Sequence, residues 1–251
     1  MLSVLAAILM QSAPATAPMR PEDTEQWTPE PPVVTPLAAV TVPPPSDAVV
    51  LFDGKDLAQW ASEDGSPARW TVKDGVLTVA KGTGDIQTRR RFGSYQLHLE
   101  YRIPANITGS GQARGNSGLF LGATGRYMGY ELQILDSYRN KTYVNGQAGS
   151  IYKQFPPLAN PTRPPGEWQS YDVVWTAPTF ASDGSLRSPA YVTAFLNGVL
   201  VQDHAALRGE TLYIGKPAYH AHGALPIKLQ DHGDPSEPIS FRNIWVRAIG
   251  N

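Results

Sequence analysis

The sequence predicts an all-β protein in which two antiparallel sheets pack face to face as a jelly-roll sandwich. Three observations predict this fold. The chain of 251 residues contains 23 glycines and 23 prolines, which favour turns over long helices. Its apolar residues fall in short runs rich in Val, Thr, Tyr and Trp, separated at even intervals by turn signals. Almost no stretch shows the apolar spacing of an amphipathic helix.

Residues 1–15 are expected to be a signal peptide. The apolar run from Leu2 to Met10 is too short to span a bilayer, and the small residues Ala13-Pro14-Ala15 that follow it suit a cleavage site. A disordered apolar start is the alternative, because the run carries no Lys or Arg. An exported protein, periplasmic or extracellular, is therefore expected.

Residues 16–46 are expected to form a proline-rich disordered tether. Nine prolines lie between Pro18 and Ser46, and such a composition favours an extended chain without a core of its own. The folded domain is expected to begin at Asp47 and to span residues 47–251.

The expected strands follow one another along this domain without an internal repeat. Asp74-Gly75 joins one pair and Asn197-Gly198 another, and both dipeptides supply the positive φ angles of a tight hairpin turn. Strands are expected at residues 48–52, 70–72, 76–79, 95–102, 118–121, 130–135, 171–176, 191–196, 199–202, 227–229 and 239–247.

Composition excludes several classes of function. The formal net charge of -1 gives no bias toward nucleic acid or an anionic membrane surface. No integral membrane segment remains once the signal is removed. The chain has no cysteine, which excludes disulfides and thiolate zinc sites.

The alternation of side chains along two strands predicts a polar groove. Leu132 and Ile134 share one face of their strand, which puts Glu131 and Gln133 together on the other. By the same rule Lys228, Gln230 and His232 lie opposite Ile227 and Leu229. Polar groups held at a strand end must be paired or solvated, so the segment Gln230-Asp231-His232-Gly233 indicates a site of chemistry.

Eight motifs, in this order, resemble the 3-keto-disaccharide hydrolase family over roughly Ala48 to Ile249. This resemblance implies a concanavalin A-like or laminin G-like sandwich, usually exported from bacteria, that acts on sugars whose 3-hydroxyl has been oxidised to a ketone. The motifs are Leu51-Phe52-Asp53-Gly54-Lys55-Asp56-Leu57, Gly84-Asp85-Ile86, Gly115-Asn116-Ser117-Gly118, Tyr130 to Ser137, Gly149-Ser150-Ile151-Tyr152, Gly166-Glu167-Trp168, Leu196-Asn197-Gly198 and Gln230-Asp231-His232-Gly233.

The implied substrate assigns catalytic roles. A ketone at C3 acidifies the hydrogen on C2, so the group on C1 can leave by elimination and water can add back afterwards. Such a reaction needs a base, a donor for the enolate oxygen and an acid for the leaving group. His232 is the expected base, because imidazole is the side chain that titrates nearest neutral pH. Glu131 is the alternative base or the acid, and Asp231 is expected to orient the imidazole.

The remaining polar positions are expected to contact substrate or to help hold a cation. No cofactor or metal is predicted. The alternative is a hard divalent ion bound by Glu131, His232 and Asp231. The expected substrate-binding residues are Arg114, Asn116, Ser117, Gln133, Tyr152, Lys153, Gln230 and Arg242.

Two other functions stay open at this point. The fold is common among lectin-like domains, so a noncatalytic carbohydrate-binding module is one alternative. A conventional jelly-roll endoglycosidase is the other, and it would need a second carboxylate about 5 to 10 Å from Glu131. The sequence does not specify the aglycone, the linkage or the oligomeric state.

Overall fold

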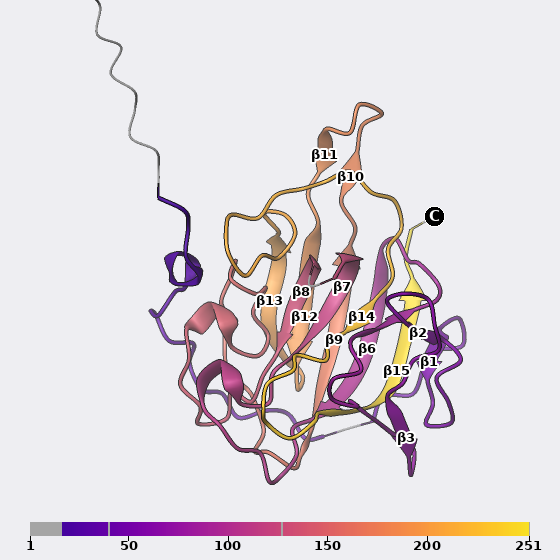
Figure 1. Ribbon diagram of the computed structural model, residues 1–251, viewed down its shortest axis with the longest axis vertical. Coiled ribbons are helices and arrows are strands. Elements are labelled where there is room, and N and C mark those ends of the chain that lie inside the picture. The colour runs from indigo at the N-terminus through magenta and orange to yellow at the C-terminus, as the bar shows by residue number, and fades with distance from the viewer. Residues whose placement is uncertain (1–16, 40, 127, 251) are drawn as a thin grey trace, which may run out of the picture.

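The computed structural model describes residues 17–39, 41–126 and 128–250, so the expected signal peptide lies outside the described residues. Two antiparallel sheets pack face to face, one of eight strands and one of five (Figure 1). The protein is therefore an all-β sandwich of jelly-roll type, as the sequence predicts. Among the described residues, no helix is long and apolar enough to cross a membrane.

The eight-stranded sheet forms one layer. Its strands run in the order β13-β12-β9-β6-β15-β4-β3, and β1 pairs with β15. The bounds are β1 Val49–Phe52, β3 Thr71–Lys73, β4 Val76–Thr78, β6 Tyr95–Arg102, β9 Trp168–Thr176, β12 Tyr191–Leu196, β13 Val199–Ala206 and β15 Ser240–Ala248.

The five-stranded sheet forms the other layer, in the order β2-β5-β14-β7-β8. A separate hairpin of β10 and β11 projects beyond both sheets (Figure 1). The bounds are β2 Trp60–Ser62, β5 Ile86–Thr88, β7 Ser117–Gly125, β8 Met128–Ile134, β10 Thr179–Phe180, β11 Leu186–Ser188 and β14 Lys228–Leu229, with short 3-10 helices η1 Pro21–Thr24, η2 Gly111–Ala113 and η3 Val144–Gly146.

Both predicted hairpin turns are confirmed. β3 and β4 are joined by Asp74 and Gly75, with φ angles of 51° and 76°. β12 and β13 are joined by Asn197 and Gly198, with φ angles of 52° and 77°. Positive φ at both central residues matches the right-handed twist of the flanking strands, so these turns fix the strand register.

The hydrophobic core lies between the two sheets. Leu97 and Leu99 of β6 are fully buried, as are Leu132 of β8 and Leu229 of β14, and all four belong to one apolar cluster. Each inner side chain contributes roughly 1.5–3 kcal/mol by leaving water. Because side chains alternate along a strand, burying Leu132 and Leu229 turns their neighbours toward the outer face of the five-stranded sheet. That outer face carries the site described below.

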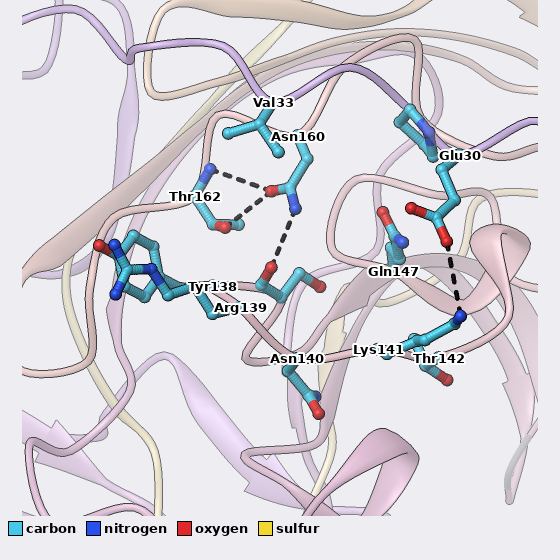
Figure 2. A pocket seen from close by; sticks show the side chains of 12 residues that line it. Glu30, Val33, Tyr138, Arg139, Asn140, Lys141, Thr142, Gln147, Asn160 and Thr162 are labelled. Carbon is cyan, nitrogen blue, oxygen red and sulfur yellow. Dashed lines mark hydrogen bonds and ion pairs between the residues drawn. The ribbon is translucent and has the colours of Figure 1, made fainter.

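The proline-rich segment differs from the expected disordered tether. Apart from the short 3-10 helix η1, its described residues form no helix or strand, and several of them bond to the sandwich. Val34 N donates to Asn160 O at 3.1 Å, and Asn160 N donates to Pro32 O at 2.9 Å. Figure 2 shows Val33 of this segment next to Asn160. Further along, Trp245 Nε1 donates to Val42 O at 3.2 Å. The backbone of an extended segment has no partners of its own, so the loops of the sandwich supply them.

Candidate active site

A cavity of about 640 Å³ opens over the outer face of the five-stranded sheet. Strands β7 and β8, with Gln230 just after β14, form its floor, and loops together with the N-terminal segment form its walls. Its size suits a small saccharide. The lining residues are Glu25, Gln112, Asn116, Phe120, Glu131, Gln133, Tyr143, Tyr152, Thr211, Tyr213, Gln230 and His232.

Glu131 lies on the floor of this cavity with Gln133, on the face that strand alternation predicts. The residue is only 6% exposed. Burial raises the pKa of Glu131 to about 8, with Lys228 lowering it and Asp85 raising it further. The side chain is therefore mostly a neutral carboxylic acid at pH 7, and it can donate a proton.

The Gln133 side-chain amide lies beside the Glu131 carboxyl group. In one amide orientation, Gln133 Nε2 donates to Glu131 Oε1 at 3.2 Å and to Ser117 O at 2.9 Å. In the other, Nε2 donates to Gln112 Oε1 at 3.1 Å and the Gln133 carbonyl oxygen faces the carboxyl group. The first orientation is favoured, because the second would place two carbonyl oxygens, those of Gln133 and Ser117, 2.9 Å apart.

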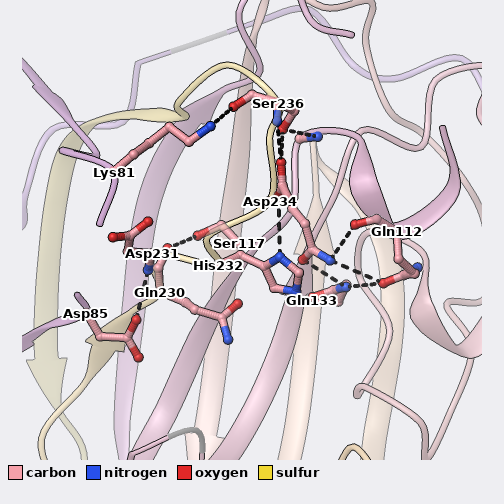
Figure 3. A network of polar contacts seen from close by, with 12 residues as sticks. Lys81, Asp85, Gln112, Ser117, Gln133, Gln230, Asp231, His232, Asp234 and Ser236 are labelled. Atoms are coloured by element: carbon pink, nitrogen blue, oxygen red, sulfur yellow. Dashed lines mark hydrogen bonds and ion pairs between the residues drawn. The ribbon is translucent and has the colours of Figure 1, made fainter. Parts of the chain in front are cut away.

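His232 faces the cavity and is held by Asp234. Nδ1 of the imidazole lies 3.4 Å from Asp234 Oδ2 (Figure 3). Burial would raise the pKa of Asp234, but contacts with His232 and Ser236 outweigh it and lower the value to about 2. An ionised carboxylate at Nδ1 keeps the proton there and leaves Nε2 as the proton acceptor.

Asp231 does not reach the imidazole, contrary to the role expected for it. Its Oδ2 accepts a hydrogen bond from Gly84 N at 3.1 Å, and its own N–H donates to Asp85 Oδ1 at 2.8 Å. The reason is parity: Gln230 and His232 point into the cavity, so the residue between them points away. The orienting carboxylate is supplied by Asp234 instead.

Lys228 is fully buried on the cavity side of the five-stranded sheet, beside Phe120, and closes an ionic network. Its Nζ lies 3.2 Å from Asp85 Oδ2 and 3.2 Å from Glu63 Oε1, and 3.0 Å from Gly125 O. The ammonium also lies 4.3 Å from the centroid of the Phe120 ring, which lines the cavity. The network thus places a positive charge where it acts on the pKa of Glu131.

Three further predicted residues line the cavity. Gln230 carries a buried side-chain oxygen, Oε1, that has no hydrogen-bond partner among the described residues. Asn116 donates from Nδ2 to Gln112 O at 2.8 Å. Tyr152 shares a hydrogen bond with Tyr143, with 2.7 Å between the hydroxyl oxygens. Oε1 of Gln230 is therefore available to accept a hydrogen bond from a bound molecule.

Four other predicted residues are bonded elsewhere. Arg114 Nε donates to the buried Asp136 at 2.5 Å. Ser117 has core parity, and its hydroxyl donates to Gln230 O at 2.8 Å. Lys153 binds main-chain oxygens of the N-terminal segment and a loop. Arg242 lies on the eight-stranded sheet, where its Nε donates to Glu100 at 2.6 Å.

The sequence interpretation missed several lining residues. Thr211 and Tyr213 lie in a loop without strand periodicity, and Glu25 lies in the segment expected to be a free tether. Gln112 lies in η2, next to a motif that the sequence interpretation did use. No alternation pattern marks such positions, because loops lack a fixed side-chain period.

Among residues 17–39, 41–126 and 128–250, no group of three or more His, Cys, Asp or Glu side chains is arranged to hold a metal ion. Glu131 and His232 share the cavity, but the Asp231 carboxylate does not join them.

One substitution in β7 tests whether activity depends on the position of the Glu131 carboxyl group. A Cβ at Gly118 would lie 2.5 Å from Glu131 Oε1. We expect Gly118→Ala to keep the fold, because the clashing atom ends a flexible side chain, and to lower kcat/KM by roughly 10²-fold by displacing the acid. Gly93→Ala, where a Cβ meets nothing within 4 Å, is the matched control. Wild-type kinetics in Gly118→Ala, measured beside an unchanged melting temperature, would contradict this placement.

The chain resembles proteins that act on carbohydrates. Residues 47–247 match the family model described as a 3-keto-alpha-glucoside-1,2-lyase-like domain. A 3-keto-disaccharide hydrolase of Bacteroides thetaiotaomicron is 24% identical over 240 residues, which cover 80% of this chain and 78% of that protein.

Solved structures show the same architecture. A crystal structure from Parabacteroides distasonis, described as that of a candidate glycosyl hydrolase, is 53% identical with a TM-score of 0.79, and the match covers 96% of this chain and 100% of that one. A second structure from the same organism, 23% identical with a TM-score of 0.58, covers 81% of this chain and 94% of its own and shares the fold.

Proposed function

The chain belongs to the 3-keto-alpha-glucoside-1,2-lyase-like family, and from this premise we propose that it cleaves the glycosidic bond of 3-keto-glycosides, including 3-keto-disaccharides. The relatives named as hydrolases support a carbohydrate-active enzyme. The observation that carries the proposal is the pairing, in one cavity, of a mostly neutral Glu131 with an imidazole held by Asp234. One group is poised to give a proton and the other to take one.

The first half of the proposed reaction is an elimination. Nε2 of His232 takes the hydrogen on C2 as a proton, and the electron pair passes to the C3 carbonyl oxygen as an enolate. When the enolate collapses, a double bond forms between C1 and C2 and the bond from C1 to the glycosidic oxygen breaks. Glu131 protonates that oxygen, so the leaving group departs as an alcohol. Nε2 of Gln230, a residue that lines the cavity, is the proposed donor to the enolate oxygen.

The second half adds water back across the new double bond. The Glu131 carboxylate takes a proton from a water molecule while the oxygen of that water bonds to C1. The imidazolium of His232 then returns a proton to C2. Both side chains thereby regain their starting charge, and the net reaction is hydrolysis. The Gln133 amide can donate to the carboxylate during this stage, which stabilises the ionised state of Glu131.

Export to the periplasm or the extracellular space is part of the same proposal. Its support is the apolar run at the start of the sequence followed by small residues. An enzyme in that location would meet oxidised sugars outside the cytoplasm. Cell fractionation of a tagged full-length protein tests this part separately, and recovery of the uncleaved chain in the cytoplasm would contradict it.

A conventional glycosidase is the second candidate, and one observation favours it. Glu25 lines the same cavity as Glu131, so a second carboxyl group is present. A conventional mechanism would act on unoxidised sugars through two carboxyl groups. The elimination route uses the imidazole instead, so the two candidates differ in both substrate and essential residue.

The test compares a 3-keto-glucoside with its unoxidised parent, for the wild type and His232→Ala, with and without a chelator. We expect release of the aglycone from the oxidised sugar alone, and a loss of roughly 10²- to 10⁴-fold in His232→Ala, as for removal of a general base. His204→Ala, at an exposed residue of β13 outside the cavity, is the matched control. Release from the unoxidised sugar would favour the conventional glycosidase, and binding without release would favour a binding module.

A further inference from the structure

We propose that residues 20–27 form a fixed wall of the active-site cavity, through which Glu25 selects substrates by charge and disfavours anionic leaving groups. The segment lies ahead of the residues that match the family, which begin at residue 47. Glu25 nevertheless lines the cavity that holds Glu131 and His232. The identity of the reacting sugar rests on the proposed function, whereas the charge selection rests on the wall itself.

Asn145 fastens this wall to the sandwich. Its side chain is fully buried, and both of its polar atoms bond to the segment. Oδ1 accepts from Gln26 N at 2.9 Å, and Nδ2 donates to Thr24 O at 2.9 Å. The neighbouring Val144 N donates to Gln26 O at 2.6 Å. The chain on both sides of Glu25 is therefore held, and the carboxyl group stays at the cavity.

Lys153 holds the segment from a second direction. Its Nζ donates to Pro21 O at 2.7 Å and to Tyr213 O at 3.0 Å, so it joins the wall to the loop across from it. Burial lowers the pKa of Lys153, and the negative charges of Glu25 and Glu22 oppose that shift. Lys153, expected from the sequence to bind substrate, thus serves as an anchor, with both hydrogen bonds directed at main-chain oxygens.

Aromatic packing completes the wall. The Trp27 ring meets the edge of Tyr143, with 6.1 Å between the ring centroids. Tyr143 lines the cavity and is hydrogen-bonded to Tyr152. Glu25 and Glu131 are both among the causes that raise the pKa of Tyr143, after burial, so the two carboxyl groups act on the same ring.

The charges around the cavity define the substrates it favours. No Lys or Arg is among the twelve described residues that line it. Glu131 is mostly neutral at pH 7, since its pKa is about 8. Glu25 therefore supplies a negative charge to the lining, which Lys153, outside the lining, offsets in part. A carboxylate or phosphate brought close to Glu25 would meet repulsion. Neutral leaving groups, such as a second sugar, fit without that cost.

The experiment measures binding separately from turnover. The full chain is titrated by calorimetry with carbon-linked 3-keto-glucosides bearing a phenyl or a 4-carboxyphenyl group, which cannot be cleaved at C1. We expect the wild type to prefer the phenyl compound, and Glu25→Gln to reduce that preference roughly fivefold, the size of one charge interaction in a partly exposed site. Asn145→Ala is also expected to reduce the preference for the phenyl compound, and to speed hydrogen exchange at the amide of Gln26.

Glu30→Gln is the control, because Glu30 makes an exposed ion pair with Lys141 at 3.9 Å and lines a different cavity (Figure 2). An unchanged preference in Glu25→Gln would overturn the inference. A loss of turnover of the oxygen-linked phenyl compound in Glu25→Gln, with no change in preference, would also overturn it and would make Glu25 catalytic. Failure of the wild type to cleave that compound would count against the proposed function alone, since the binding ratio is read independently.

Discussion

Replacing Glu131 with Gln is expected to lower kcat by roughly 10²- to 10⁴-fold, the usual contribution of a general acid or base. The amide has nearly the same shape as the neutral acid but cannot give up a proton to the leaving oxygen. In the wild type, kcat/KM is expected to fall as pH rises through about 8, because the pKa of Glu131 is about 8 and the protonated form is the reactive one. The variant should lose that alkaline fall.

The control for this variant is Glu167→Gln, at an exposed residue that precedes β9. Melting temperatures of both variants should stay near that of the wild type, since Gln leaves no charge unpaired in the cavity. A pH profile measured from pH 5 to 10 checks the assignment. An alkaline fall retained at pH 8 in Glu131→Gln would show that another group supplies the proton.

Replacing Lys228 with Met is expected to destabilise the protein by about 3–5 kcal/mol, the cost of removing one partner from a buried ion pair. The change deletes the cation that lies 3.2 Å from both Asp85 Oδ2 and Glu63 Oε1. Asp85 is itself buried, and burial raises its pKa, so its carboxyl group would be left without compensation. Unfolding in urea measures the loss.

A double variant separates the ion pair from simple packing. Lys228→Met combined with Asp85→Asn removes the uncompensated charge, so it should be more stable than the sum of the two single changes predicts. Lys73→Met, at an exposed residue of β3, is the surface control. Additive losses in the double variant would contradict the role assigned to the ion pair.

Strand alternation predicts the floor of the site from the sequence. Glu131 and Gln133 lie in the cavity because Leu132 must lie in the core, and Gln230 and His232 follow the same rule from Leu229. The period of two is set by the backbone, so it holds wherever one face of a strand is buried. The hairpin dipeptides are equally informative, since few residues accept their φ angles.

The walls could not be predicted in that way. Asp231 follows the parity rule away from the imidazole, and the contact comes from Asp234, two residues beyond His232 in a loop. Glu25 reaches the cavity only because Asn145 binds the chain that carries it. The bonds of Asn145 to this segment join residues more than a hundred positions apart, and no local pattern encodes them.

His98, on the eight-stranded sheet, is another residue whose surroundings strand alternation does not predict. Alternation along β6 predicts an exposed side chain, yet His98 is fully buried, with its ring stacked 5.4 Å from that of Trp245. Burial would lower its pKa, but the hydrogen bond to Asp172 and the carboxylate of Glu100, 3.6 Å from Nε2, outweigh that effect and raise the value to about 9. Pairing with two carboxylates makes its burial on this face tolerable.

The central claim is that the reaction breaks the C2–H bond, and a 3-keto-glucoside labelled with deuterium at C2 tests it most directly. We expect the wild type to release the label to water in the course of cleavage, or to cleave the labelled sugar more slowly than the unlabelled one in single-turnover experiments. Product incubated without enzyme corrects for spontaneous exchange. Full retention of the label with an unchanged rate would contradict the elimination and would favour direct hydrolysis.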